Sequence, residues 1–172
     1  RPHIRIITNE KNEGFIQPNM RALFHANGDY FVMLNNACVV SKGWLDRLSE
    51  PFSNPVVKLV GLEGACGSLT PEFRGYHGYD LEYLEGSCLM GQTAFLRQIG
   101  LFDDNLVGAY GEDADLSLRV RKMGYVIRAV RAGVTHLGGM TSALVPESKD
   151  WFAQNMTYLR KKWEHYLVTK TF

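Results

Sequence analysis

The sequence predicts one α/β domain in which a mostly parallel sheet is flanked by helices. Three observations support this class. The chain has 172 residues, which is enough for one domain with a sizeable core. Short β-branched or apolar runs alternate with segments of helical spacing, as in parallel α/β sheets. Apolar residues make up 45% and charged residues 22%, which is ordinary globular usage and excludes a long disordered or rod-like chain.

The first elements follow from local composition. Residues 4–7 are a short β-branched run and predict a strand. Pro18 favours the start of a helix that Asn27-Gly28 ends. Residues 30–34 are apolar without alternation, which predicts a central parallel strand covered on both faces. A short helix near residues 44–51 and a strand over 56–60 complete this half.

The second half continues the alternation. Residues 71–85 mix aromatic residues with glycines and charges without any period, which predicts an ordered loop. Helices are expected over 92–99 and from Gly111 to Gly124, with a strand over 125–130 between them and the C-terminus. An amphipathic helix over about 147–168 is predicted to present one apolar face, formed by Phe152, Met156, Leu159, Trp163 and Leu167.

Charge and cysteine usage exclude several classes of protein. Lys plus Arg is 19 and Asp plus Glu is 18, and this net charge of +1 argues against a protein that coats nucleic acid. Cys38, Cys66 and Cys88 form no CxxC pair, so neither a disulfide framework nor a zinc site is expected. No apolar run reaches bilayer length and no signal peptide is visible. We expect a cytoplasmic protein without a transmembrane segment.

Three carboxylates crowd one short stretch, at Glu112, Asp113 and Asp115. On a structural interpretation, they favour a helix N-terminus through the helix dipole and the free N–H groups there. On a functional interpretation, a carboxylate fixed at a loop-to-helix junction and open to a cleft removes a proton from a substrate hydroxyl. The residues alone leave both interpretations open.

Two weaker candidates lie elsewhere. Asn35 and Asn36 follow the most apolar run, and α/β sheets bind ligands beyond the carboxyl ends of their strands. The same pair also suits a simple turn. His136 has no ligand spacing with another histidine, and an isolated histidine is more often structural than a metal ligand. The phosphate-loop sequences GxxxxGK[ST] and GxGxxG are absent.

A series of short segments runs through nearly the whole chain in a fixed order. They are Asn12-Glu13-Gly14-Phe15, Asn19, residues 28–36, Trp44-Leu45, residues 84–90, residues 99–104, residues 111–116 with Arg119, Gly124-Tyr125 and His136. This series resembles the family-2-like inverting glycosyltransferases of GT-A fold, especially bacterial rhamnosyltransferase-type members. The resemblance implies a partial GT-A fold over residues 1–172.

The resemblance also implies roles for individual residues. Asp113 matches the base that activates the acceptor hydroxyl, and Glu112 matches a residue that contacts the acceptor or supports the base. The other matching positions are Asn35, Asn36, Gly14 and Asn19 on the donor side and Gly86 and Ser87 on the acceptor side. Because flat aromatic faces stack on sugar rings, Tyr76 and Tyr79 in the 71–85 loop are further candidates for acceptor binding, with a loop fastened by buried aromatics as the alternative.

The sequence departs from the family pattern in two places. The metal-ligand Asp is expected at position 37, where this chain has Ala37, so binding of Mg²⁺ or Mn²⁺ is doubtful even though His136 matches a residue that completes the metal site in some relatives. The family also opens with an additional strand and helix that contribute to the nucleotide pocket, and this chain begins later. We therefore expect an exposed sheet edge that pairs with a second copy or with a partner segment.

Two functions remain in view. The first is an enzyme that moves a hexose or deoxyhexose from a nucleotide-sugar to a hydroxyl of a glycan or lipid-linked acceptor with inversion. The resemblance places such an enzyme in polysaccharide biosynthesis, in the cytoplasm or at the inner face of the membrane. The second is a degenerate GT-A domain that binds glycan or nucleotide, or acts as a scaffold, without catalysis. Glu112 and Asp113 favour the first function, and Ala37 favours the second.

Overall fold

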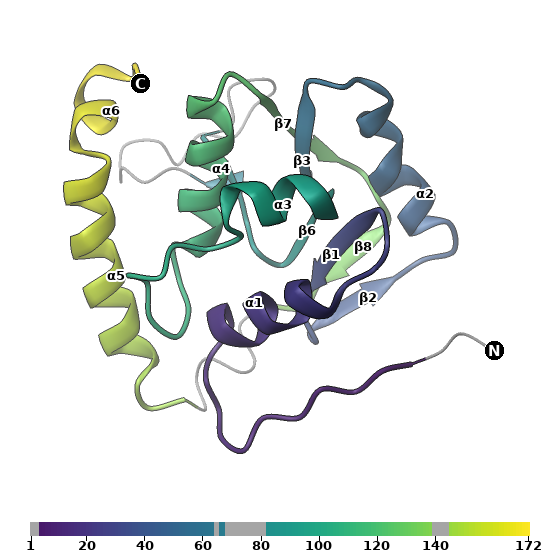
Figure 1. Ribbon diagram of the computed structural model, residues 1–172, viewed down its shortest axis with the longest axis horizontal. Coiled ribbons are helices and arrows are strands. Elements are labelled where there is room, and N and C mark those ends of the chain that lie inside the picture. Colours follow the sequence, from purple (N-terminus) through teal and green to yellow (C-terminus); the bar gives the residue numbers. More distant parts are fainter. Residues whose placement is uncertain (1–3, 64–65, 68–81, 139–144) are drawn as a thin grey trace.

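The computed structural model describes residues 4–63, 66–67, 82–138 and 145–172. Its helices are α1 (Ile16–His25), α2 (Trp44–Ser49), the 3-10 helix η1 (Glu50–Ser53), α3 (Thr93–Ile99), α4 (Glu112–Lys122), α5 (Ser148–Lys162) and α6 (Glu164–Thr169), shown in Figure 1. Its strands are β1 (Tyr30–Leu34), β2 (Cys38–Val40), β3 (Val57–Leu62), β4 (Cys66–Gly67), β5 (Tyr83–Leu84), β6 (Cys88–Gln92), β7 (Val126–Val130) and β8 (Val134–His136).

The main sheet has four strands in the order β1-β6-β3-β7. The predicted α/β class with flanking helices is confirmed, but the prediction of a mostly parallel sheet is wrong. Among the described strands, only β3 and β7 pair in parallel, whereas β6 runs antiparallel to both β1 and β3. The two inner positions therefore belong to β6 and β3, both mostly buried, and β1 lies at the edge of the sheet.

The core occupies both faces of this sheet because side chains alternate along each strand. On one face, Leu59 of β3 and Leu89 of β6 pack with side chains from α1, α3, α4 and α5. On the other face, Val60 of β3 packs with Leu48 of α2 and Phe52 of η1. Leu59, Leu89 and Leu48 are fully buried, and each such burial contributes about 2 kcal/mol.

Residues 4–7, predicted as a strand, form no strand in the structure. Ile4 and Ile6 are 82% and 80% exposed, and the segment runs along the outside of the molecule below α1 (Figure 1). β-branched residues favour a strand only when a neighbouring strand supplies hydrogen bonds, and none lies beside this segment in the described part of the chain.

Strand β1 has a single neighbour, β6, in the described sheet. Tyr30 and Leu34 at its two ends are 39% and 40% exposed. The expected exposed sheet edge is therefore present at β1. Pairing of this edge with a second copy or a partner segment stays a prediction.

The C-terminal segment forms two helices where one was predicted. The helix breaks at Trp163, between α5 and α6. The predicted apolar face is correct for Leu159 and Trp163, which are buried, but wrong for Phe152, which is 52% exposed. A polar residue, Asn155, is fully buried on this face instead.

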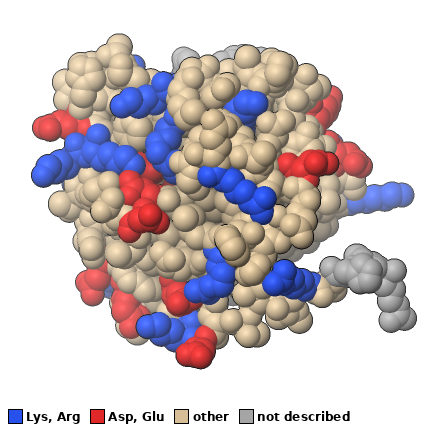
Figure 2. Space-filling view, in the orientation of Figure 1, with Lys and Arg blue, Asp and Glu red and all other residues tan. Residues whose placement is uncertain are grey.

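The predicted aromatic loop over 71–85 lies mostly outside the described residues, and so do Tyr76 and Tyr79. Its last residues form β5, which pairs with β4. No helix in the described ranges is long and apolar enough to cross a membrane. Figure 2 shows Lys and Arg interspersed with Asp and Glu on one face, in keeping with the near-zero net charge.

Candidate functional site

The N-terminus of α4 carries the acidic cluster. Gly111 precedes the helix with a φ of 85°, a left-handed conformation that favours glycine, and the helix begins at the next residue, Glu112. Oδ1 of Asp113 accepts a hydrogen bond of 2.7 Å from the N–H of Ala114, one of the backbone donors free at a helix start. The structural interpretation of the cluster therefore holds for part of it, because these carboxylates stabilise the first turn.

Asp113 is also tied to the turn between β5 and β6. Its Oδ2 accepts a hydrogen bond of 2.8 Å from the N–H of Gly86. The next residue, Ser87, uses its carbonyl oxygen to accept the N–H of Asn35 at 2.9 Å. One short turn thus brings together the predicted base, two predicted acceptor-side residues and the end of β1.

Two polar atoms in this cluster are buried without partners. Glu112 and Ser87 are each 5% exposed, and neither Oε2 of Glu112 nor Oγ of Ser87 has a hydrogen-bond partner among the described residues. Gly86 has no side chain, and a Cβ built there would lie 3.5 Å from Oδ2 of Asp113 and 3.6 Å from Oε1 of Glu112. Buried polar atoms normally find partners, so these two are exceptions within the described part of the chain.

Burial raises the pKa of both carboxyl groups above the usual range. At Glu112 the neighbouring charge of Asp113 raises the pKa further. At Asp113 the backbone N–H groups of Gly86 and Ala114 oppose the effect of burial, since they stabilise the carboxylate form. A carboxylate whose pKa is raised toward neutrality is a better proton acceptor for a hydroxyl.

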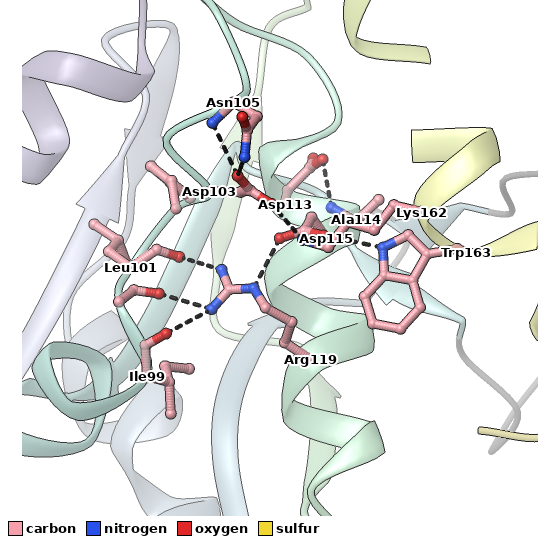
Figure 3. Close-up of polar contacts among 12 residues, drawn as sticks. Ile99, Leu101, Asp103, Asn105, Asp113, Ala114, Asp115, Arg119, Lys162 and Trp163 are labelled. Carbon is pink, nitrogen blue, oxygen red and sulfur yellow. Dashed lines mark hydrogen bonds and ion pairs between the residues drawn. The ribbon is translucent and has the colours of Figure 1, made fainter. Parts of the chain in front are cut away.

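Asp115, one turn along the helix, has a different role. It is fully buried and accepts hydrogen bonds from Arg119 at 2.7 Å and from Nε1 of Trp163 at 2.9 Å, and Lys162 lies 2.6 Å away (Figure 3). Arg119 also donates to the carbonyls of residues 99–101. Asp115 is thus a structural anchor that joins α4 to α5 and to the segment after α3.

Asp103 extends this anchor toward α5. Lys162 lies 2.5 Å from its Oδ2, and the hydroxyl of Tyr158 donates to the same oxygen at 2.9 Å. Burial alone would raise the pKa of Asp103, but hydrogen bonds from Lys162, Asn105 and Tyr158 outweigh it and hold the pKa below the usual range. Local sequence patterns do not indicate this network, because Asp103 lies 55 and 59 residues from Tyr158 and Lys162 along the chain.

The donor-side candidates at the end of β1 are less enclosed. Oδ1 of Asn35 accepts the N–H of Ala37 at 2.9 Å, which is the turn chemistry that was the simpler interpretation of this pair. Asn36 is exposed. The backbone N–H of Asn35 contacts Ser87, the residue after Gly86, and Gly86 contacts Asp113, so this turn links Asn35 to the acidic cluster.

Gly14 and Asn19 make contacts with the backbone at the start of α1. A Cβ on Gly14 would lie 2.3 Å from the carbonyl oxygen of Gly108, so only glycine fits there. That same carbonyl accepts the N–H groups of Phe15 and Ile16. Nδ2 of Asn19 donates to the carbonyl of Phe15 at 2.8 Å. These contacts account for both residues without a ligand.

His136 lies directly opposite Cys38 in the antiparallel pair of β2 and β8. The strand pairing thus puts His136 next to position 37, since the N–H of Leu137 donates to the carbonyl of Ala37 at 2.9 Å. The donor set does not fit Mg²⁺ or Mn²⁺, which prefer oxygen ligands, because Ala37 supplies no ligand atom and burial raises the pKa of the Cys38 thiol. No group of three acidic, histidine or cysteine side chains arranged for a metal occurs within residues 4–63, 82–138 and 145–172.

Comparison with known proteins places these features in a family. Residues 1–95 match the family model of glycosyl transferase family 2. Two curated relatives are the inactive polypeptide N-acetylgalactosaminyltransferase-like protein 5 of Macaca fascicularis, 23% identical, and that of Mus musculus, 22% identical. Each alignment covers 77% of this chain, but the chain spans only 38% and 39% of the lengths of these relatives.

Solved structures show the same fold at low sequence identity. GalNAc-T7 with UDP, GalNAc and Mn²⁺ superimposes with a TM-score of 0.58 at 19% identity, covering 74% of this chain and 31% of its own. The mannosyltransferase PcManGT of Pyrobaculum calidifontis, with GDP-Man and Mn²⁺, gives 0.57 at 15% identity, covering 73% and 36%. Glucosyl-3-phosphoglycerate synthase of Mycobacterium tuberculosis gives 0.52 at 19% identity, covering 84% and 54%.

The fold of these neighbours agrees with the α/β architecture described above, and the family model covers more than half of the sequence. The acidic cluster lies beyond the matched residues, at the start of α4. The chain belongs to glycosyl transferase family 2.

Proposed function

We propose that this domain transfers a sugar from a nucleotide-sugar to an acceptor hydroxyl, with Asp113 as the general base. The observation that carries the proposal is the pair of hydrogen bonds at the 85–87 turn. Gly86 holds the carboxylate of Asp113, and Ser87 holds the end of β1. The acid pair and the donor-side residues therefore share one rigid support.

The chemistry follows from the states of the two carboxylates. Asp113 accepts the proton of the acceptor hydroxyl, and the hydroxyl oxygen attacks the anomeric carbon. The bond between that carbon and the diphosphate oxygen breaks, and the nucleoside diphosphate leaves with the electron pair. Attack from the face opposite the diphosphate inverts the anomeric centre.

Glu112 has a supporting role in this proposal. It is more enclosed than Asp113, since only 5% of it is exposed whereas Asp113 is partly exposed. Its unpartnered Oε2 is available to accept a hydrogen bond from the acceptor sugar. Oγ of Ser87 is a second free polar atom for the same sugar. Asn35 and Asn36 are assigned to the donor.

A transfer assay with product analysis tests the proposal. The chain is incubated with a panel of nucleotide-hexoses and nucleotide-deoxyhexoses and with glycan or lipid-linked acceptors, and the anomeric configuration of the product is determined by NMR. An inverted product that disappears with Asp113→Asn supports the proposal. A retained configuration would contradict a direct displacement assisted by Asp113.

The alternative is a non-catalytic domain that binds a nucleotide-sugar or a glycan. Two observations favour it: the two curated relatives are named inactive, and the place of the metal ligand is held by Ala37. Calorimetry with nucleotide-sugars separates the two functions when it is combined with the assay. Binding without turnover by any donor and acceptor of the panel favours the binding domain.

Location and partners are part of the same proposal. A lipid-linked acceptor would place the reaction at the inner face of a membrane, and the exposed edge of β1 would pair with a second copy or a partner segment. Sedimentation at two protein concentrations tests the self-association.

A further inference from the structure

Asn155 lies in the middle of α5, and its side chain is fully buried against the loop that precedes α4. Its Oδ1 accepts the N–H of Val107 at 3.0 Å. Its Nδ2 lies 2.9 Å from each of three carbonyl oxygens, those of Val107, Ala109 and Tyr110. One amide side chain therefore contacts four of the eight backbone N–H and C=O groups of residues 107–110.

This loop adopts backbone conformations that need such support. Gly108, Tyr110 and Gly111 have φ values of 61°, 81° and 85°, in the left-handed region. Tyr110 is not a glycine, so its conformation costs free energy that other contacts must offset. Its carbonyl is one of those that Asn155 binds.

The loop is also seated closely on α5. A Cβ on Gly108 would lie 2.1 Å from the ring of Trp151, and a Cβ on Gly111 would lie 2.4 Å from Leu159. Gly108 is therefore required by close approach to the Trp151 ring as well as by its φ, whereas Gly111 is required chiefly by its φ. The helix acts as a template against which residues 107–111 take one shape.

The shape of this loop sets the position of the acid pair, because Glu112 follows Gly111 directly. A backbone N–H of Tyr110 also stabilises the carboxylate form of Glu112. The carbonyl of Gly108 receives the N–H groups of Phe15 and Ile16, so the same loop also fixes the start of α1. Asn155 thus touches neither carboxylate but binds the backbone that carries them.

We infer that Asn155 is a positioning residue, which holds residues 107–110 so that Glu112 and Asp113 face the 85–87 turn. The catalytic part of this inference rests on the proposed function. The structural part, that the environment of the acid pair depends on Asn155, stands without it. The test therefore uses two readouts that need no turnover and one that does.

The variant is Asn155→Ala, and the control is Gln154→Ala, an exposed neighbour on the same helix. We expect hydrogen exchange of the Val107 amide to accelerate by more than about tenfold in Asn155→Ala, because its acceptor is removed. We expect the pKa of the Glu112 carboxyl, followed by NMR titration, to move down toward its usual range as the loop opens to water. If transfer activity is present, kcat should fall more than about tenfold with KM within about twofold. The control should match the unmodified protein in all three.

A second variant separates positioning from loss of packing. Tyr110→Gly removes the cost of the left-handed conformation, so adding it to Asn155→Ala should recover part of the Val107 protection and part of the Glu112 pKa shift. Because the Tyr110 ring also packs edge-on against Phe152 of α5 at 5.7 Å, the single variant Tyr110→Gly is measured as the reference for the double variant. Recovery in the double variant supports the inference, and additive losses contradict it.

The unmodified protein supplies a measurement if Asn155→Ala does not fold. The Val107 amide should then exchange as slowly as the α5 amides around residue 155. Its hydrogen bond to Oδ1 of Asn155 breaks only when α5 separates from the loop. Exchange at the rate of an open loop would overturn the inference. Unchanged titration of Glu112 in a folded Asn155→Ala would overturn it as well. If the readouts without turnover behave as expected and no donor is turned over, the proposed function fails and the inference stands.

Discussion

The N-terminus of α4 and the segment after β1 meet the same turn, residues 85–87, but they are held in different ways. Glu112 is buried, Asp113 has hydrogen bonds to both carboxylate oxygens, and the turn of helix that follows is anchored by the buried Asp115. The segment after β1 has the exposed Asn36 and, at position 37, an alanine. The carboxylates at the start of α4 are thus held by contacts in the core, whereas the segment after β1 has few polar side chains held in place. On the proposed function, the half that would activate the acceptor is preorganised, and affinity for the diphosphate would depend on groups elsewhere.

The largest expected effect tests whether Asp113, at the more enclosed start of α4, acts as the general base. Asp113→Asn keeps an acceptor for the Gly86 N–H but removes the proton acceptor, so kcat/KM should fall roughly 10²–10⁴-fold in the transfer assay. Asp104→Asn, at an exposed carboxylate nearby, is the matched control and should leave the rate unchanged. A rate for Asp113→Asn within about twofold of the unmodified enzyme would remove Asp113 from the mechanism.

The next largest effect concerns stability on the two sides. Asp115→Ala removes the buried acceptor of Arg119 and of Nε1 of Trp163, while Lys162 keeps Asp103, so urea unfolding should show a loss of about 3 kcal/mol or more. Asn36→Ala, on the exposed side, should change the free energy of unfolding by less than about 0.5 kcal/mol. Equal losses at the two positions would mean that the two sides are held equally well.

A third effect appears in the pH dependence of stability. Burial raises the pKa of Glu112, so the folded state binds a proton more tightly than the unfolded state. The contribution of protonated Glu112 to the free energy of unfolding is fully present below the ordinary carboxyl pKa of about 4. It is lost as pH rises through the raised pKa of Glu112. Glu112→Gln should therefore gain about 1 kcal/mol relative to the unmodified protein between pH 5 and pH 8, measured by urea unfolding at each pH.

Asp103 changes the pH dependence of stability in the opposite direction to Glu112. Its pKa is lowered, so its contribution is present above the ordinary carboxyl pKa of about 4 and is lost as pH falls below it. The Glu112→Gln comparison from pH 5 to pH 8 avoids that window. Parallel stability curves for the two proteins across this range would contradict a raised pKa for Glu112.

The smallest expected effect tests whether the segment after β1 binds a metal ion when position 37 carries a carboxylate. Ala37→Asp adds a carboxylate beside the Cys38–His136 pair, and Mn²⁺ at about ten times its Kd would then stabilise the fold by about 1.4 kcal/mol. The melting temperature in Mn²⁺ against EDTA measures this gain. His136→Ala in the Ala37→Asp background should abolish it. A Mn²⁺ response in the unmodified protein that His136→Ala removes would show that a metal already binds there.

Local patterns predicted the helices well, because glycines and prolines mark their ends. Gly111 and Gly124 bracket α4 as expected. The sheet was predicted less well, since the pairing of strands depends on distant residues. The apolar run of β1 was expected at the centre, but β6 and β3 take the inner positions.

The candidate site shows the same division between local and distant information. Clustered carboxylates identified Glu112 and Asp113, and the turn chemistry of Asn35 was one of two stated interpretations. Asn155 lies on a helix whose apolar periodicity was predicted correctly in part, yet a buried asparagine is not distinguishable in sequence from a surface one. Its role depends on the loop that it faces, which only the fold brings close.

The close seating of residues 107–111 on α5 limits how this protein is recombined with its relatives. Trp151 leaves no room for a side chain at Gly108, Leu159 lies against Gly111, and Asn155 matches the backbone between these two glycines. A chimera that exchanged the C-terminal helix alone would pair a foreign surface with this loop. Residues 99–111 and 148–163 therefore form one unit of exchange, and grafts should move both segments together.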